Sequence, residues 1–191
     1  MVLDTSNITK LKIDDNEVFL EELGPNQGKI ILSDSYGHNY SYYWGAMGGT
    51  LKDFILHINE DYFAKNLGNK MRVFNPVKTF SNVRKYIRED MGYPYYWEME
   101  FQKDMREKLK EFQSEVEDWG GKYTFVDRFF PSFVERLNYS LIKNDFDRKQ
   151  FENEINNITE PWHFIEEKQS DEYIWLCKFH KKLKKELKKL K

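Results

Sequence analysis

The chain has 191 residues, of which 40% are hydrophobic and 17% aromatic, and its formal net charge is −2. This length suits one domain or two small ones, and the aromatic content excludes an intrinsically disordered chain. A single cysteine, Cys177, excludes an intramolecular disulfide, and no apolar run approaches the ~18 residues of a membrane span. Because no secretory pattern opens the chain, we expect a soluble protein of the cytoplasm.

The first quarter of the chain reads as short antiparallel strands. Leu11 and Ile13 alternate with Lys10 and Lys12, which is the period of a half-buried strand. Turn residues then separate further apolar runs. We therefore predict strands over residues 9–13, 18–22, 29–34 and 38–44. Their short connections predict antiparallel pairing.

A glycine-rich corner, residues 45–49, leads from the last strand into a predicted helix. Thr50 is the expected N-cap, with Asp53 three residues later as in a capping box. One stripe of apolar residues predicts a single helix ending before Gly68; it comprises Leu51, Phe54, Ile55, Ile58, Tyr62 and Phe63. The corner has the form of an anion site. It lacks the ending of a phosphate-binding loop, so we interpret it as a tight turn.

Beyond residue 70 the apolar spacing is helical. Asn75-Pro76 predicts the start of one helix, Pro94 and Pro131 predict two more, and a short fourth precedes Pro161. The residues expected to face inward are Val77, Phe80, Val83, Ile87, Met91, Phe101, Met105, Leu109, Phe112, Val116, Trp119, Val134, Leu137, Leu141, Phe151, Ile155 and Ile158. The predicted fold class is α+β. A sheet-plus-helix unit over 1–70 is followed by a bundle-like helical region over 71–191, with a soft boundary that also permits one domain.

Ser170 is the expected N-cap of a final helix that combines leucines with lysines. Residues 178–191 contain eight lysines and one glutamate, whereas residues 1–70 contain six lysines and ten acidic residues. A basic amphipathic helix of this kind is typical of contacts with phosphates, anionic membranes or partner proteins. The structural alternative is that its leucines complete the core while the lysines are solvated. The residues predicted to bind are Lys181, Lys182, Lys184, Lys185, Lys188 and Lys189.

The strand over 38–44 is the most unusual stretch. Its period places His38, Tyr40, Tyr42 and Trp44 on one face, with Asn39, Ser41 and Tyr43 on the other. An exposed aromatic face is typical of single-stranded nucleic-acid binding. The following helix needs a surface to pack on, however, so we expect the Trp44 face to be core. A partly exposed rim of Tyr36, His38 and Tyr43 remains as a candidate contact surface.

Catalytic and metal signatures are weak. The best local metal pair is His57 with Glu60, and a metal site needs three or four converging ligands. Cys177 lies in an apolar stretch, which favours an inert buried thiol over a nucleophile. We therefore expect a protein that is not an enzyme and that has no metal or cofactor. The alternative is a small hydrolase whose site is assembled from residues distant in sequence.

Residues 29–67, KIILSDSYGHNYSYYWGAMGGTLKDFILHINEDYFAKNL, resemble a segment of small uncharacterised proteins of phages and other mobile elements. The shared features are the Tyr/Trp strand, the glycine corner and the Asp-Tyr-Phe of the helix. The resemblance implies no activity and no site residue. It implies a context, since many compact mobile-element proteins bind host machinery, among them anti-CRISPR inhibitors.

Together these observations favour a non-enzymatic inhibitor that engages a host protein or ribonucleoprotein complex, such as a CRISPR effector nuclease or its guide RNA. The terminal lysines are then expected to contact RNA. The alternative is a stand-alone nucleic-acid-binding accessory protein that uses the basic C-terminal helix. The oligomeric state is not predicted by the sequence.

Overall fold

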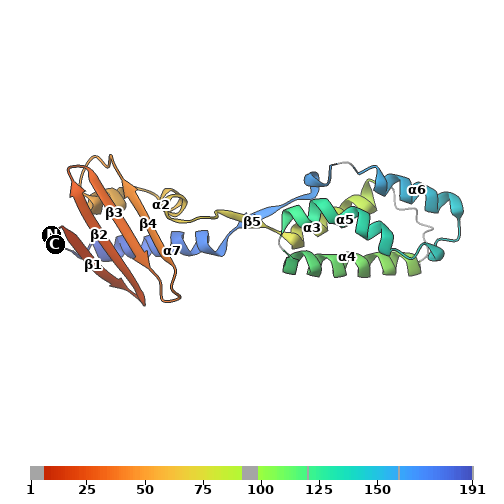
Figure 1. The fold of residues 1–191 in the computed structure, drawn as a ribbon, viewed down its shortest axis with the longest axis horizontal. Helices are drawn as coiled ribbons and strands as arrows, with labels where there is room; N and C mark the ends of the chain where they lie inside the picture. Colours follow the sequence, from red (N-terminus) through yellow and green to blue (C-terminus); the bar gives the residue numbers. More distant parts are fainter. Residues whose placement is uncertain (1–6, 92–98, 120, 159, 191) are drawn as a thin grey trace. The chain divides into compact units, whose positions relative to one another are not determined.

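A computed structural model describes residues 7–91, 99–119, 121–158 and 160–190 (Figure 1). It confirms the α+β class, with an antiparallel sheet followed by helices. The chain forms two compact units: unit 1 contains residues 1–72 and 169–191, and unit 2 contains residues 73–168. Two short strands, β5 (Arg72–Phe74) and β6 (Glu167–Gln169), pair where the chain passes between the units. No helix in the described ranges is long and apolar enough to cross a membrane.

The sheet of unit 1 has four strands in the order β1-β2-β3-β4: β1 (Ile8–Ile13), β2 (Asn16–Gly24), β3 (Gln27–Ser33) and β4 (Asn39–Trp44). Every neighbouring pair is antiparallel, as predicted. Alternation along each strand directs Val18, Ile30 and Leu32 into the core, where none is exposed to solvent. The opposite face carries Lys10 and Phe19, whose ring centre lies 5.0 Å from the lysine nitrogen.

Two helices, and not the predicted single one, follow the glycine corner: α1 (Leu51–His57) and α2 (Glu60–Leu67). Thr50 caps α1 as expected, accepting a hydrogen bond from the Asp53 N–H at 3.1 Å. The break occurs because Asn59 caps α2, its side chain accepting from the Tyr62 N–H at 2.8 Å. An Asn followed by two acidic residues is itself a helix-start signal, so a new helix begins there although the apolar stripe continues.

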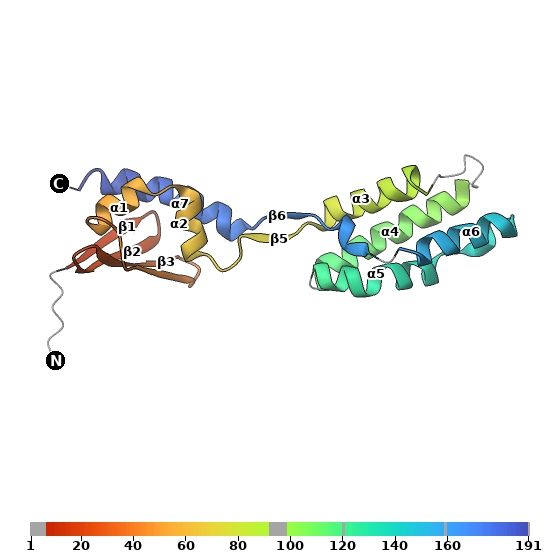
Figure 2. The ribbon, with the colours of Figure 1, turned by 90° about the horizontal axis from the view of Figure 1, so that it is seen from above.

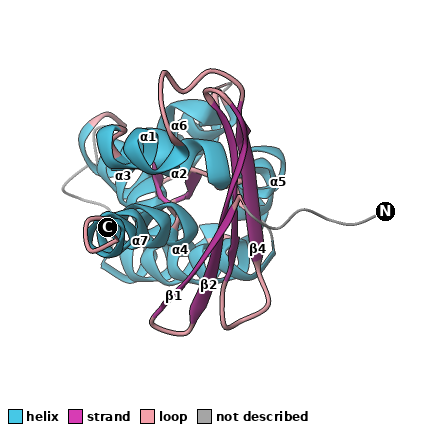
Figure 3. Cartoon of the chain, turned by 90° about the vertical axis from the view of Figure 1, so that its left-hand side faces the viewer, coloured by secondary structure: helices cyan, strands magenta, loops and turns pink. Residues whose placement is uncertain are grey.

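The final helix, α7 (Asp171–Leu187), packs against α1 and α2 on one face of the sheet (Figures 2 and 3). Ser170 caps it as predicted, and Leu176, Leu183 and Leu187 are fully buried. The two units therefore differ from the expected segments 1–70 and 71–191. The leucine stripe needs an apolar surface, and Ile55 and Phe63 provide one within the sheet unit.

α2 and α7 approach each other so closely at position 68 that only a glycine fits there. A Cβ at this position would lie 3.0 Å from both the Ala64 carbonyl oxygen and the Leu176 side chain. Gly68 has a φ of −82° at the C-cap of α2, so it is required for space and not for a left-handed conformation.

Unit 2 is helical and has a phenylalanine-rich core. Its elements are α3 (Pro76–Glu89), α4 (Met99–Trp119), α5 (Lys122–Arg136), η1 (Tyr139–Leu141), α6 (Asp145–Asn156) and η2 (Pro161–Phe164). On α5, Phe125, Phe129 and Phe133 recur every fourth residue and are fully or almost fully buried. Adjacent rings in this row stack at 5.0 and 5.4 Å.

Most of the inward-facing positions predicted for this region are buried, and two predictions were wrong. Pro131 lies inside α5, which begins nine residues earlier at Lys122, because the Phe row holds one continuous helix despite the missing N–H. Val77 is 58% exposed on the first turn of α3. Val134, Leu141 and Ile158 are partly buried and pack against the core. Pro94 and the Trp119 side chain lie outside the described residues.

Candidate functional site

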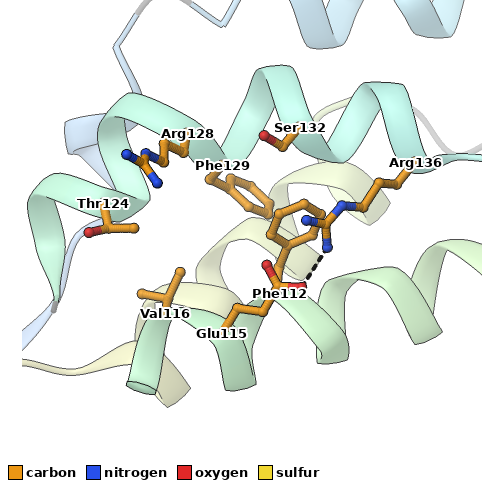
Figure 4. Close-up of a pocket in the computed structure, with 8 residues that line it drawn as sticks. All are labelled: Phe112, Glu115, Val116, Thr124, Arg128, Phe129, Ser132 and Arg136. Atoms are coloured by element: carbon orange, nitrogen blue, oxygen red, sulfur yellow. Dashed lines mark hydrogen bonds and ion pairs between the residues drawn. The ribbon is translucent and has the colours of Figure 1, made fainter. Parts of the chain in front are cut away.

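Unit 2 contains a cleft of about 180 Å³ between α4 and α5 (Figure 4). Its floor is apolar and is formed by Phe112, Val116 and Phe129. Polar side chains surround this floor, so the cleft combines an aromatic base with hydrogen-bonding walls. The polar lining residues are Glu115, Thr124, Arg128, Ser132 and Arg136.

The four polar residues from α5 lie on one stripe of the helix. Thr124, Arg128, Ser132 and Arg136 follow one another at intervals of four, which places successive side chains above each other on one face. The neighbouring row, beginning at Phe125, fills the core. The same helix therefore packs with one stripe and presents the adjacent stripe to the cleft.

The two arginines of the cleft differ in their partners. Arg136 lies 2.5 Å from the Glu115 carboxylate, and its guanidinium carbon lies 4.2 Å from the centre of the Phe112 ring. The hydrogen bond that Arg136 donates to the Glu115 carboxylate raises the pKa of Arg136. Arg128 is exposed and forms no ion pair with any described acidic residue. Arg136 is thus held in place, while Arg128 supplies a positive charge that the cleft itself does not neutralise.

The size of the cleft limits what it can hold. Sites for small molecules and cofactors usually enclose ~300–1,000 Å³. A cleft of about 180 Å³ matches one large side chain with little space beyond it. An aromatic floor next to arginine is also the composition of the energetically dominant centres of protein interfaces. The arrangement suits insertion of an apolar anchor residue that has an acidic neighbour for Arg128.

The lysines predicted as a binding surface are mostly engaged within unit 1. Four of the six contact described groups: Lys181 with Glu60 (3.2 Å), Lys182 with Asp14 (2.6 Å), Lys184 with the Ile58 carbonyl (2.6 Å) and Lys189 with Glu186 (2.7 Å). Lys185 and Lys188 are exposed, and no described acidic side chain pairs with either. Lys181, Lys182 and Lys184 therefore hold α7 against the rest of unit 1, whereas Lys189 pairs with a residue of α7 itself.

The three residues of the predicted aromatic rim are exposed on β4 and in the turn before it. Tyr43 is 48% exposed on the open face of the sheet, whereas Tyr36 is 87% exposed in the turn before β4. His38 lies at the end of that turn, and its Nδ1 is 2.7 Å from the Asp34 carboxylate. Although burial alone would raise the pKa of Asp34, hydrogen bonds from His38 and from the Tyr36 N–H lower it. Tyr40 and Trp44 are buried, which confirms that this face of β4 is core.

The reactive groups singled out in the sequence have ordinary surroundings. Burial raises the pKa of the Cys177 thiol, which disfavours the thiolate. His57 Nδ1 lies 2.6 Å from the Asp53 carbonyl of its own helix, and Glu60 pairs with Lys181. Within the described ranges, no three His, Cys, Asp or Glu side chains lie close enough together to hold a metal.

The cleft was not predicted from the sequence. Its signal was the four-residue spacing of Thr124, Arg128, Ser132 and Arg136, which becomes visible only when one helix is drawn from Lys122. Placing the helix start at Pro131 divided the stripe. The α4 side of the cleft was also hidden, because spacing in one helix does not identify the helix that faces it.

Comparison with known proteins identified a phage protein family. A family model, Phage_phiTE_072, described as a phage family, matches residues 1–189. No curated protein and no solved structure matches the chain significantly. The match extends the resemblance noted for residues 29–67 to nearly the whole chain.

Proposed function

The chain belongs to the phage protein family Phage_phiTE_072, and from this premise we propose that it is a non-catalytic binding protein that engages a protein complex of the host. The observation that carries the proposal is the α4–α5 cleft. It is sized for one side chain, has an aromatic floor and offers Arg128, which pairs with no described acidic residue. The proposed partner is a defence complex, such as a CRISPR effector nuclease with its guide RNA. This choice rests on the phage origin of the family.

Protein is favoured over nucleic acid as the ligand because of charge. Unit 2 contains fifteen lysines and arginines against nineteen acidic residues, so its field repels phosphate backbones. Unit 1 contains the basic helix, but Asp14, Glu60 and Glu186 neutralise three of its lysines. Binding to nucleic acid is dominated by the number of phosphates that free cations neutralise.

The test is affinity capture from a lysate of the phage host, with and without nuclease. The full chain is compared with Arg128→Glu, which reverses the free charge of the cleft, and with Ser132→Phe, which fills it. Arg106→Glu is the matched control: this exposed arginine on α4 contacts its own helix and lies outside the cleft.

We expect the same partner to be captured by the full chain and by Arg106→Glu, to resist nuclease, and to be lost with both cleft variants. Circular dichroism verifies that the variants are folded. Capture that is equal for all four proteins would refute the role of the cleft. Capture that disappears with nuclease would refute a protein partner.

A second function, stand-alone nucleic-acid binding, is favoured by one observation: Lys185 and Lys188, near the C-terminus of α7, are exposed and pair with no acidic side chain that the structure describes. Its test is the salt dependence of RNA and DNA binding in Lys185→Glu/Lys188→Glu. If this candidate is correct, the unmodified chain binds at ~150 mM salt and the double variant does not. Absence of binding by the unmodified chain under these conditions excludes it.

A further inference from the structure

Strand β4 presents an unpaired main-chain edge. It is the last strand of the sheet order, so one side bonds to β3 and the other has no strand of the described residues beside it. The Asp34 N–H donates to the His38 carbonyl at 2.9 Å, which makes this pair the hydrogen-bonded end of the β3–β4 ladder. Because bonded and non-bonded pairs alternate in antiparallel sheets, Tyr40, Tyr42 and Trp44 bond toward β3.

It follows that the N–H and C=O groups of Asn39, Ser41 and Tyr43 point away from the sheet. All three residues are exposed, and no described residue hydrogen-bonds to these groups. The edge therefore displays three donors and three acceptors in an unbroken register. Such an edge is a template for another strand.

Natural proteins usually protect sheet edges with charges, proline, bulges or a covering element. The other edge strand of this sheet, β1, has Lys10 and Lys12 on its outer face and contacts α7. β4 has the sequence Asn-Tyr-Ser-Tyr-Tyr-Trp, which contains no charge and no proline, and its pairing with β3 has no bulge. In contrast to β1, the β4 edge therefore lacks charge, proline and bulges that would hinder pairing with another strand.

We propose that the β4 edge pairs with the β4 edge of a second copy of this chain, antiparallel and about a two-fold axis at Ser41. In this register Ser41 lies opposite Ser41 and Tyr43 lies opposite Asn39, so all six outward groups of each strand are satisfied. The register also keeps Tyr40 and Tyr42 on the helix-covered side of both sheets. A two-fold axis at Tyr42 would leave part of the edge unpaired.

Charge supports a second copy as the occupant. Two identical strands bring like charges together unless they are neutral, and β4 is neutral along its whole length. Lys29 on β3 lies opposite Tyr43, and the contact between the Asp34 carboxylate and His38 Nδ1 lies before the N-terminal end of β4. In the antiparallel dimer the pair of Asp34 and His38 approaches the uncharged end of the partner strand, which continues into Gly45 and Ala46.

The principal test uses Ser41→Lys and Ser41→Glu in the full chain, studied by sedimentation velocity over a range of concentrations. The unmodified chain is expected to form dimers, and each variant alone is expected to be monomeric because like charges meet at the axis. An equimolar mixture is expected to recover the dimer. Recovery in the mixture shows that both variants are folded. An unmodified chain that stays monomeric at every concentration, or variants that still dimerise separately, would overturn the proposal.

A cross-link tests the register. In a Cys177→Ser background, Ser41→Cys places two thiols on opposing Cα atoms ~5.5 Å apart, within the range of a disulfide. Asn39→Cys is the matched control, because four strand positions, ~14 Å, separate the two copies of that residue in the proposed register. We expect a covalent dimer only with Ser41→Cys. Cross-linking of Asn39→Cys alone would refute the Ser41-centred pairing.

Discussion

Acidification should weaken unit 1 through one buried histidine. His180 has no exposed surface; its Nε2 lies 3.1 Å from the Ile55 carbonyl oxygen, and its ring stacks on Phe63 at 4.4 Å. Nδ1 is buried without a described hydrogen-bond partner. Burial, assisted by the positive charge of Lys184, lowers the pKa of His180 to about 4, although the Ile55 carbonyl acts in the opposite direction.

The direction of the effect follows from where the proton binds first. As the pH falls below ~6.5, the unfolded chain accepts a proton on this histidine while the folded chain does not. The contribution of neutral His180 to the free energy of unfolding is therefore complete above pH ~6.5. It is lost between this pH and about 4, the pKa of His180 in the folded chain. The full loss is on the order of 3 kcal/mol, and about 2 kcal/mol is lost by pH ~5.

The reference variant is His180→Gln, because glutamine can donate to the Ile55 carbonyl and does not titrate. Native-state hydrogen exchange of β2 and β3 in the full chain, corrected for the intrinsic rate at each pH, gives the free energy of unfolding. Between pH ~7 and ~5 the unmodified chain should lose about 2 kcal/mol more than the variant. Carboxylates such as Asp61 titrate in both proteins, so their contributions cancel in the difference between the two free energies of unfolding. A gap that does not change with pH would refute the reasoning, and exchange in α4 serves as the internal control.

Three further predictions concern packing and capping. Phe129→Ala should lower the free energy of unfolding of unit 2, measured by hydrogen exchange in α4, by about 3–5 kcal/mol. Protection in β2 should be unchanged, and equal losses in α4 and β2 would contradict two separate cores. Gly68→Ala should destabilise unit 1 by about 1–3 kcal/mol in chemical denaturation, because its Cβ meets Ala64 and Leu176 at 3.0 Å; an unchanged midpoint would show that α7 can move aside. Glu22→Ala should cost about 1 kcal/mol, since its carboxylate accepts from the Leu51 N–H at 2.7 Å, and Glu22→Gln should recover most of it.

Local signals in the sequence predicted where helices and strands form better than they predicted which of these elements pack together. Thr50, Asn75 and Ser170 were identified as caps from local chemistry, and each makes the expected hydrogen bond. Asn59 was overlooked because the apolar stripe on either side of it continued without interruption. A cap is decided within four residues, so a short stretch of sequence suffices to find it.

Long-range pairing was not predictable in the same way. The leucine stripe of α7 was recognised, but leucine spacing does not specify whether a helix packs on a sheet or on a bundle. Glu22, which receives the first N–H of α1 from 29 residues away, shows the same limit. The cleft combines both difficulties, since it needs the correct start of α5 and the identity of the helix facing it.

The discontinuity of unit 1 has a consequence for synthesis on the ribosome. His180 bonds to Ile55 across 125 positions, so the first core can close only after the last helix has been made. Unit 2 is translated whole before that moment, and its ends are already joined, the Asn75 N–H donating to the Glu166 carbonyl at 2.8 Å. If unit 2 folds while attached to the ribosome, it shortens the loop that α7 must close and reduces the entropy lost in closing it. The order of translation thus favours the inserted unit folding first and the enclosing unit last.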